Sequence, residues 1–260
     1  AASSDYPLRD VYKRQILHLA PTSPMYNYSA RRINSVLNAI NTPSRYLEIG
    51  VESGHTFFEV TASSKTAVDP AFTFNTEEGK QAEPTSHFLQ ITSDEYFQNH
   101  WNGEAFDFIF LDGLHTWDQT YRDFCNSLLA THERSVILLD DIFPSDVFSC
   151  NRDQVEAVMM RQFMANDPSN AWHGDTYKII PLIRTFHPLL SYCTIITDVN
   201  PQALVWRSKK PSQASPILSD VGALNMPTLD YLWFLRNQES YNLMNEEDAL
   251  TLVINSMSRD

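Results

Sequence analysis

Acidic residues follow two apolar segments of the chain, at positions where their side chains could do chemistry. Asp112 comes directly after FDFIFL, and Asp140-Asp141 comes directly after SVILL. Ligands of open α/β sheets bind at the carboxyl ends of the strands, so we expect these acids to converge in one crevice. Carboxylates gathered at one place repel one another unless a cation lies between them, and a hard ion such as Mg²⁺ prefers oxygen ligands. The spacing therefore predicts a metal site formed by Asp112, Asp140 and Asp141.

A histidine accompanies the first of these acids. His115 lies shortly after Asp112, in the sequence DGLH. Imidazole has an ordinary pKa near neutrality, which suits a general base, and a neighbouring metal ion lowers the pKa of a hydroxyl bound to it. The pair is suited to activating a hydroxyl oxygen as a nucleophile, and we assign His115 the role of the base.

A glycine turn, EIGVESG at residues 48–54, separates a strand-like segment from a helix-like one. Dinucleotide-binding enzymes normally carry GxGxxG there, because closely spaced glycines let the backbone cradle a pyrophosphate. This turn lacks that pattern and contains carboxylates instead, which suits S-adenosylmethionine, a cofactor with ammonium and sulfonium groups and no phosphate. We expect cofactor contacts from Glu48, Gly50, Glu52 and Gly54.

Further cofactor contacts are expected at the ends of the next strands. Asp69, in AVDP, stands where an acid accepts hydrogen bonds from both ribose hydroxyls of a nucleoside. Ser93 and Asp94 follow the third strand, where they would bracket the adenine. Asp112 borders the same crevice and is also expected to contact the cofactor. Methyl transfer from a sulfonium to a hydroxyl oxygen is the chemistry that these positions predict.

Strand-like and helix-like segments alternate along the chain and position these residues. Short apolar runs predict strands, and apolar residues at helical spacing predict helices. The expected strands are residues 45–49, 66–68, 88–91, 106–111, 136–139, 193–197 and 203–206. The expected helices are residues 28–40, 56–62, 151–164, 175–189, 229–236 and 246–257.

The order of these elements predicts the fold class. Alternating strands and helices indicate an α/β fold with a Rossmann-like, doubly wound, mostly parallel sheet. The last two strands have hairpin spacing and predict an antiparallel edge, and a helical C-terminal extension follows them. The uninterrupted apolar run 136–139 favours a central strand buried on both faces, with parallel neighbours.

We expect the chain to divide into three regions. Residues 1–22 form a poorly ordered or artefactual N-terminus, because LRDVYKRQ at residues 8–15 resembles translated sequencing-adapter sequence. Residues 23–210 form the cofactor-binding domain. Residues 211–260 form the helical extension, whose aromatic residues either pack back on the domain or form a homodimer contact.

Together the motifs resemble the metal-dependent macrolide-sugar O-methyltransferases of the macrocin and mycinamicin type and the related cephalosporin-biosynthesis methyltransferase family. The resemblance covers roughly residues 46–206 and lies in the glycine turn, Asp69, DGLH with Asp123 further along, and Asp140-Asp141. It implies a class I S-adenosylmethionine-dependent methyltransferase, with metal ligation by Asp112, Asp140 and Asp141 and proton abstraction by His115. It also implies cofactor contacts from Glu48, Gly50, Gly54 and Asp69. Catechol O-methyltransferase is similar in layout but carries lysine in place of His115 and Asp-Asn in place of Asp140-Asp141.

Composition restricts the partners that the chain can bind. The formal net charge of −13 repels phosphate backbones and anionic lipid surfaces, so we expect neither a nucleic acid nor a membrane partner. No apolar run approaches the roughly 18 residues that span a bilayer, and the three cysteines form no CxxC pair. We expect a cytoplasmic protein that acts on the hydroxyl of a small molecule such as a sugar or another secondary metabolite.

Several residues also have plainer interpretations. Gly50 and Gly54 fit an ordinary turn, and an aspartate at a strand end is often a turn former or a helix cap. Asp175 is interpreted as a helix N-cap and Asp123 as structural. Trp172 and His173, on the loop before Asp175, are candidates for lining the mouth of the substrate site.

Other functions stay open at this stage. A methyltransferase of the same fold without a metal, acting on nitrogen, carbon or a carboxylate, fits much of the pattern. So does a Rossmann-like NAD-dependent oxidoreductase, or a protein that keeps the fold only for interaction. The identity of the methyl acceptor is not encoded in any of these motifs.

Overall fold

The computed structural model describes residues 26–40, 43–197, 200–207 and 225–257. Within these ranges the chain forms one eight-stranded sheet, with the strand order β3-β2-β1-β4-β5-β7-β6-β8. The expected N-terminal region 1–22 and the first residues of the expected C-terminal extension, 211–224, lie outside the described residues. The strands are β1 Arg45–Ile49, β2 Ser64–Val68, β3 Ser86–Leu89, β4 Phe106–Leu111, β5 Thr131–Leu139, β6 Leu190–Ile195, β7 Gln202–Arg207 and β8 Leu243–Met244.

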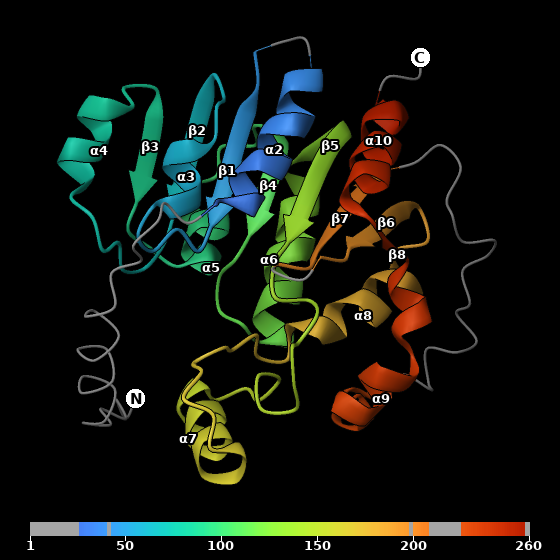
Figure 1. Ribbon diagram of the computed structural model, residues 1–260. Coiled ribbons are helices and arrows are strands. Elements are labelled where there is room, and N and C mark those ends of the chain that lie inside the picture. Colours follow the sequence, from blue (N-terminus) through green and yellow to red (C-terminus); the bar gives the residue numbers. More distant parts are fainter. Residues whose placement is uncertain (1–25, 41–42, 198–199, 208–224, 258–260) are drawn as a thin grey trace.

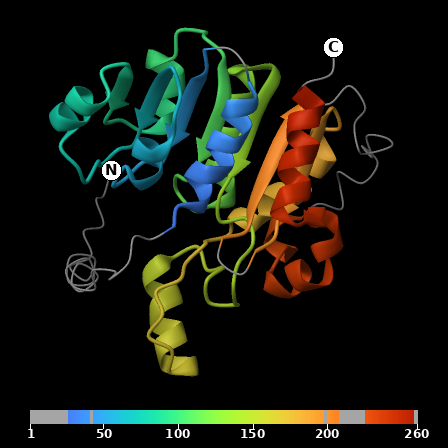
Figure 2. The ribbon, with the colours of Figure 1, turned by 45° about the horizontal axis from the view of Figure 1, so that its top comes forward.

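Helices cover both faces of this sheet (Figures 1 and 2). The α-helices are α2 Tyr28–Ala39, α3 His55–Glu59, α4 Thr76–Ala82, α5 Ser93–Glu95, α6 Trp117–Leu129, α7 Gln154–Ala165, α8 Ile179–Phe186, α9 Tyr231–Arg236 and α10 Glu246–Met257. Shorter helical turns occur at Tyr96–His100, Thr176–Lys178, Met226–Thr228 and Gln238–Tyr241. In both views α7 projects away from the sheet.

Successive side chains of the central strands point to opposite faces of the sheet, and this divides the core into two layers. On β4, Ile109 and Leu111 face the layer that also contains residues of α6, α8 and α9, whereas Phe108 and Phe110 face the layer of α2, α3 and α10. Successive side chains of a strand point to opposite faces, so a strand that is apolar throughout must be covered on both. The predicted α/β, doubly wound fold is therefore confirmed.

The expectation of parallel neighbours for the central strand is half wrong. β5 pairs with β4 in parallel, but on its other side β7 runs antiparallel, with Leu139 opposite Ala203. β7 returns from β6 through a hairpin and inserts between β6 and β5. An apolar run reports burial on both faces and carries no information about the direction of the neighbouring strand, which is why the sequence misled here.

The other elements differ from expectation mainly in their bounds. The strand at 106–111 and the helix at 246–257 agree to the residue, whereas the helix expected at 175–189 is a 3₁₀ turn followed by α8. The two-residue strand β8 was not expected. It pairs in parallel with β6 and makes the outer edge, so the hairpin is not the last pair of the sheet.

The C-terminal aromatic cluster packs back on the sheet. Phe234 is fully buried, and its ring makes edge contacts with the rings of Phe143, Tyr177 and Tyr241. The hydroxyl of Tyr241 donates to the carbonyl of Tyr177 at 2.8 Å. These contacts attach the C-terminal segment to the layer of α8, and a homodimer contact stays a prediction.

The helices within the described ranges are short or carry many polar residues. None of those helices combines the length and the apolar character that a membrane span requires.

Replacing Phe234 by alanine should destabilise the whole domain, because a buried aromatic ring is lost from the junction of α9 with the core. We expect the free energy of unfolding to fall by about 3–5 kcal/mol, measured by chemical denaturation. Leu232→Ala is the matched control on the same helix, since its side chain is 58% exposed. A Phe234→Ala variant as stable as the control would show that the C-terminal segment does not pack on the domain in solution.

Candidate functional site

The acids predicted to meet lie at the carboxyl edge of the central strands. The hydrogen-bond ladder continues one residue past each strand: Asp140 N–H donates to the carbonyl of Leu111, and Asp112 N–H to that of Ile49. On the same edge, Gly50 N–H donates to the carbonyl of Val68. Parallel strands that end in register therefore bring Asp112 and Asp140 side by side.

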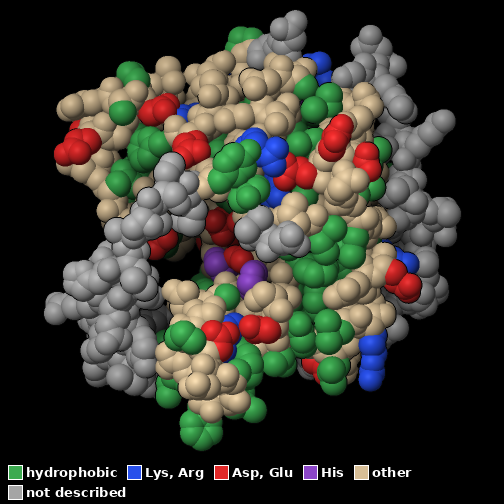
Figure 3. Space-filling view, viewed as in Figure 1, with side chains coloured by type: hydrophobic (Ala, Val, Ile, Leu, Met, Phe, Trp, Pro, Cys, Tyr) green, Lys and Arg blue, Asp and Glu red, His purple; other side chains and the backbone are tan. Residues whose placement is uncertain are grey.

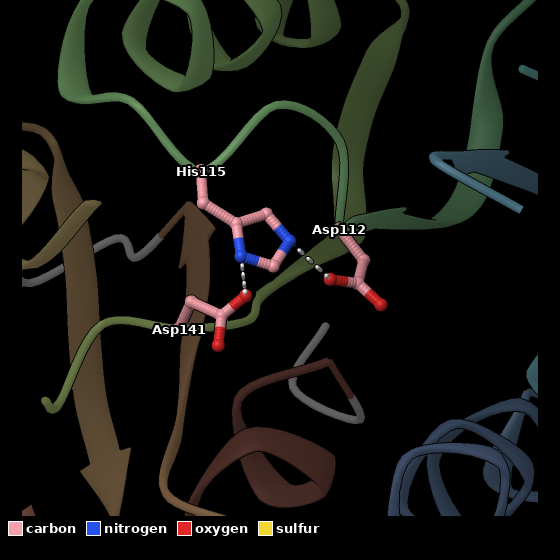
Figure 4. A group of neighbouring side chains, drawn as sticks. All are labelled: Asp112, His115 and Asp141. Carbon is pink, nitrogen blue, oxygen red and sulfur yellow. Dashed lines mark ion pairs between the residues drawn. The ribbon is translucent and has the colours of Figure 1, made fainter. Parts of the chain in front are cut away.

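Three side chains converge at this edge. Ligand atoms of Asp112, His115 and Asp141 all lie within 4.8 Å of one another (Figure 4). His115 Nδ1 lies 2.9 Å from Asp141 Oδ2, and His115 Nε2 lies 3.6 Å from Asp112 Oδ1. Figure 3 shows histidine and acidic side chains gathered in a hollow of this face. The imidazole of His115 thus bridges two carboxylates.

Asp140 does not belong to this group of three. Its Oδ1 accepts a hydrogen bond from the backbone N–H of Asp141 at 2.9 Å, and its Oδ2 accepts one from the side-chain amide of Gln202 at 3.1 Å. Of the three predicted metal ligands, the structure thus brings Asp112 and Asp141 together with His115. The third, Asp140, lies outside this group, and each of its oxygens accepts a hydrogen bond from the protein.

Negative charge is concentrated at this site. Desolvation, followed by repulsion from Asp140 and Asp141, raises the pKa of Asp112 well above its ordinary value. Desolvation and Asp141 likewise raise the pKa of Asp140 to about 7. Among the ion pairs of the described residues, none joins a lysine or arginine to Asp112, Asp140 or Asp141. The site is therefore suited to a cationic ligand.

The side chain of His115 interacts with these carboxylates. Burial lowers the pKa of His115, but Asp141 and Asp140 together outweigh it, so the pKa lies above the ordinary value. An imidazole between two carboxylates is also a donor set that divalent metals accept. Asp112, His115 and Asp141 therefore fit a metal ion, and His115 equally fits a base oriented by Asp141.

A loop after α7 holds His115 in place. The ring of Trp172 stacks on the imidazole at 4.7 Å between centroids and 14° between planes. Gly174 has φ +60°, and a Cβ there would lie 1.6 Å from the carbonyl oxygen of His115. Trp172 Nε1 in turn donates to the carbonyl of Asn151 at 2.6 Å. Trp172 thus orients the predicted base, a contact that no pattern in the sequence indicates.

His173, on the same loop, is partly buried, and burial lowers the pKa of its imidazole. Its backbone N–H donates to the carbonyl of Ser149 at 2.9 Å. The WHGD sequence was the available signal for this loop, but nothing in it points to a contact with His115.

Asp175 caps a different helix from the one expected. Its side chain makes no capping bond at the 3₁₀ turn that follows it. Instead, buried Asp175 accepts a hydrogen bond from the backbone N–H of Trp117, the first residue of α6, at 2.9 Å. Lys178 and Arg152 pair with the same carboxylate. The interpretation as an N-cap of its own helix is therefore wrong, because stronger partners lie across the loop.

The glycine turn presses against the end of β4. Gly50 has φ +87°, and a Cβ there would lie 1.9 Å from the carbonyl oxygen of Asp112. Gly54, with φ +77°, would instead meet the ring of Phe58 at 2.4 Å. The first glycine thus permits the close approach of two strand ends, whereas the second permits local packing at the start of α3.

Asp69 braces this turn from the end of β2. Its Oδ2 accepts the backbone N–H of Glu52 at 2.8 Å, and its Oδ1 accepts that of Ala71 at 2.7 Å. Glu52 itself has φ +44° and an exposed side chain. Each carboxylate oxygen of Asp69 keeps a second lone pair, so the side chain can hold the turn and still accept from a ligand.

Glu48 is buried within β1. The hydroxyl of Tyr46 donates to its Oε2 at 2.5 Å, and burial raises the pKa of Glu48 to about 8. Tyr46 and Glu48 are alternate residues of one strand and so share a face of the sheet. The predicted cofactor contact of Glu48 stays a prediction.

Ser93 and Asp94 are joined to α6 through one amide. Gln119 Nε2 donates to Ser93 Oγ at 3.2 Å, to Asp94 Oδ1 at 3.3 Å and to Asp123 Oδ1 at 3.0 Å. Asp94 also pairs with Arg122 at 2.8 Å. Burial raises the pKa of Asp123 to about 6. The predicted role of Ser93 and Asp94 at the adenine stays a prediction.

The stretch with this geometry matches a known family model. Residues 47–142 match a family described as a methyltransferase domain. The match runs from β1 to just beyond Asp141 and so includes all the predicted catalytic, metal-binding and cofactor-binding residues. This part of the chain is therefore similar to a methyltransferase domain.

Solved structures of methyltransferases resemble this domain in fold. One is an O-methyltransferase from Bacillus cereus in complex with SAH, with 15% identity, coverage of 77% of this chain and 90% of that chain, and a TM-score of 0.47. Another is the O-methyltransferase TomG from Streptomyces achromogenes in complex with SAM, with 13% identity, coverage of 77% and 96%, and a TM-score of 0.44. None of the curated proteins matches the chain closely enough to count as a relative.

Replacing Gly50 by alanine should destabilise the domain, because the added methyl group collides with the backbone at Asp112. Gly103→Ala is the matched control, since Gly103 has φ +88° and a methyl group added there would meet no atom within 4 Å beyond its chain neighbours. In the control, the free energy of unfolding should fall only by the cost of placing alanine in the left-handed conformation, about 1–2 kcal/mol. For Gly50→Ala, the free energy of unfolding measured with a denaturant should fall by several kcal/mol more. Equal losses would mean that the turn does not approach β4 this closely.

Proposed function

We propose that this methyltransferase domain transfers a methyl group from S-adenosylmethionine to the hydroxyl oxygen of a small molecule, such as a sugar or another secondary metabolite. The observation that carries the proposal is the bridge formed by His115 between Asp141 and Asp112, beside the glycine turn braced by Asp69. The site combines an acidic crevice for a cationic cofactor with a base next to it.

The charge of the crevice supports S-adenosylmethionine as the cofactor. The cofactor, when bound, supplies an electrophilic methyl group on a sulfonium. Asp69 has free lone pairs to accept from the ribose hydroxyls, while the surrounding acids attract the ammonium and sulfonium charges. The turn at Gly50 lacks the GxGxxG pattern that would cradle a pyrophosphate, which argues against NAD.

The contacts of His115 support its role as the base that takes the hydroxyl proton. Asp141 Oδ2 lies 2.9 Å from Nδ1, so the carboxylate favours the neutral tautomer that keeps its proton on Nδ1 and leaves Nε2 to accept one. The two nearby carboxylates stabilise the imidazolium that forms. Stacking on Trp172 limits rotation of the ring. The hydroxyl oxygen thereby becomes a better nucleophile for an in-line displacement at the methyl group.

Asp112 and Asp141 are the residues that would hold a divalent ion such as Mg²⁺. Bound there, the ion would lower the pKa of the acceptor hydroxyl. A reaction without a metal is the second candidate, and the His115–Asp141 contact favours it, because a base oriented by a carboxylate can abstract the proton unaided.

Calorimetry with S-adenosylhomocysteine and with NAD tests the cofactor. We expect saturable binding of S-adenosylhomocysteine and none of NAD. Asp69→Ala should weaken the binding roughly tenfold or more, since hydrogen bonds to a charged group contribute about 1.5–3 kcal/mol. Asp153→Ala, which removes the N-cap of α7, should leave it unchanged. Binding of NAD in place of S-adenosylhomocysteine would reject the proposal.

Chelation tests the metal. Turnover of S-adenosylmethionine should be measured against a panel of hydroxyl-bearing acceptors, with and without EDTA. If Asp112 and Asp141 hold a metal that activates the hydroxyl, EDTA should lower turnover on the order of a hundredfold, the scale of a catalytic contribution of this kind, and Mg²⁺ should restore it. Turnover that is unchanged by EDTA would assign the proton transfer to His115 and Asp141 alone.

A further inference from the structure

A chain of buried polar side chains reaches the site from the opposite side of the sheet edge. Arg32, on α2, and Gln202, at the start of β7, are both fully buried. Arg32 Nη1 donates to Gln202 Oε1 at 2.6 Å, and Gln202 Nε2 donates to Asp140 Oδ2 at 3.1 Å. Fully buried charged and amide groups are uncommon unless their hydrogen bonds are satisfied, so this chain is a specific arrangement.

The chemistry of Arg32 determines which way the Gln202 amide points. A guanidinium has only donors, so the amide oxygen must face it and the NH₂ group must face the other way. That NH₂ group donates both to Ser29 Oγ at 2.7 Å and to Asp140. Asp140 therefore meets a donor that cannot be exchanged for an acceptor by a flip of the amide.

Charge supports the same arrangement. Burial lowers the pKa of Arg32 to about 10, with Asp140 acting in the opposite direction, so the guanidinium stays charged near neutrality. Glu246, at the start of α10, pairs with Arg32 at 2.8 Å and with the neighbouring Arg31. The chain of contacts thus begins at a compensated ion pair and ends at the carboxylate of Asp140.

Asp140, held by Gln202, in turn holds the backbone of Asp141. Its second oxygen accepts the backbone N–H of Asp141, which adopts the left-handed conformation with φ +57°. Such a backbone is uncommon for a residue with a side chain and persists where surrounding contacts enforce it. In this conformation Asp141 places Oδ2 2.9 Å from His115 Nδ1.

We propose that Asp140 is a positioning residue and not a ligand of the site, and that Gln202 and Arg32 hold its carboxylate so that Asp141 orients His115. The inference rests on the proposed function in taking His115 as the base. It assigns a role to two residues, one before the family match and one after it. It also predicts that disturbing the chain of contacts changes the state of the His115 ring without emptying the cofactor site.

The test compares Gln202→Met with Ser29→Ala. Gln202→Met removes the donor to Asp140 at similar side-chain length. Ser29→Ala removes the other acceptor of the same amide, which also accepts from Asn200, and leaves the donor to Asp140 in place. The readout is the ¹⁵N NMR spectrum of the His115 ring at an alkaline pH, where imidazole is neutral, assigned by its loss in His115→Gln. In the unaltered protein and in Ser29→Ala, Nδ1 should give a separate protonated-nitrogen signal. In Gln202→Met that signal should be lost, and the two ring nitrogens should move toward a common averaged position.

A second pair of variants keeps the test independent of one substitution. Arg32→Gln and Arg31→Gln each remove a partner of Glu246, but only Arg32 contacts Gln202. The first should reproduce the change in the His115 signal and the second should not. Thermal unfolding and S-adenosylhomocysteine binding are measured on every variant to confirm that it is folded.

The outcomes separate this inference from the proposed function. An unchanged His115 signal in folded Gln202→Met or Arg32→Gln that still binds S-adenosylhomocysteine would overturn the inference and leave the proposed function intact. Failure of the unaltered protein to bind S-adenosylhomocysteine would overturn the proposed function, whatever the ring signal shows. The same change in Ser29→Ala as in Gln202→Met would mean that the signal reports general loosening, which also overturns the inference.

Discussion

Repulsion between acids at the carboxyl edge of the sheet is the constraint on which the site depends. The ladder that continues past each strand places Asp112 beside Asp140, and the chain then turns through Asp141. Burial, and after it this crowding, raises the pKa values of Asp112 and Asp140. Carboxylates held this close need donors or positive charge nearby. The protein supplies them from two sides, with His115 on one and the amide of Gln202 on the other, and each acid is thereby given a different task.

Holding His115 in this position occupies a long segment of the chain. Between β5 and β6 the chain leaves the sheet, forms α7 and returns through the loop with Trp172 and Gly174. Arg161 of α7, which is 1% exposed, pairs with Asp146 at 3.0 Å and so joins α7 to the segment that follows β5. Gly174 then approaches the backbone of His115 where no larger residue fits. The position of the imidazole thus depends on contacts made far along the sequence from DGLH.

The sequence was most informative about features that leave a local pattern of residue types, such as the ends of buried strands. Apolar runs that end in Asp112 or Asp140 marked the strand ends correctly, because burial on both faces excludes polar residues until the strand leaves the core. The same runs could not report the direction of a neighbouring strand, so the antiparallel pairing of β7 with β5 was missed, and with it the contact between Gln202 and Asp140. The stack of Trp172 on His115 could not be predicted either, because a contact between residues far apart in the sequence leaves no periodic pattern in either segment.

The adjacent pair Asp140-Asp141 shows where reasoning from residue types stops. Two neighbouring aspartates at one strand end look equivalent, and both were predicted to bind a metal. In the structure the left-handed backbone at Asp141 sends the two carboxylates to different partners, one to Gln202 and the other to His115. That separation requires a donor opposite Asp140, and the donor is present only because β7 runs antiparallel to β5 and brings Gln202 next to it. The topology of the sheet therefore decides which acid contacts His115 and which is held by Gln202.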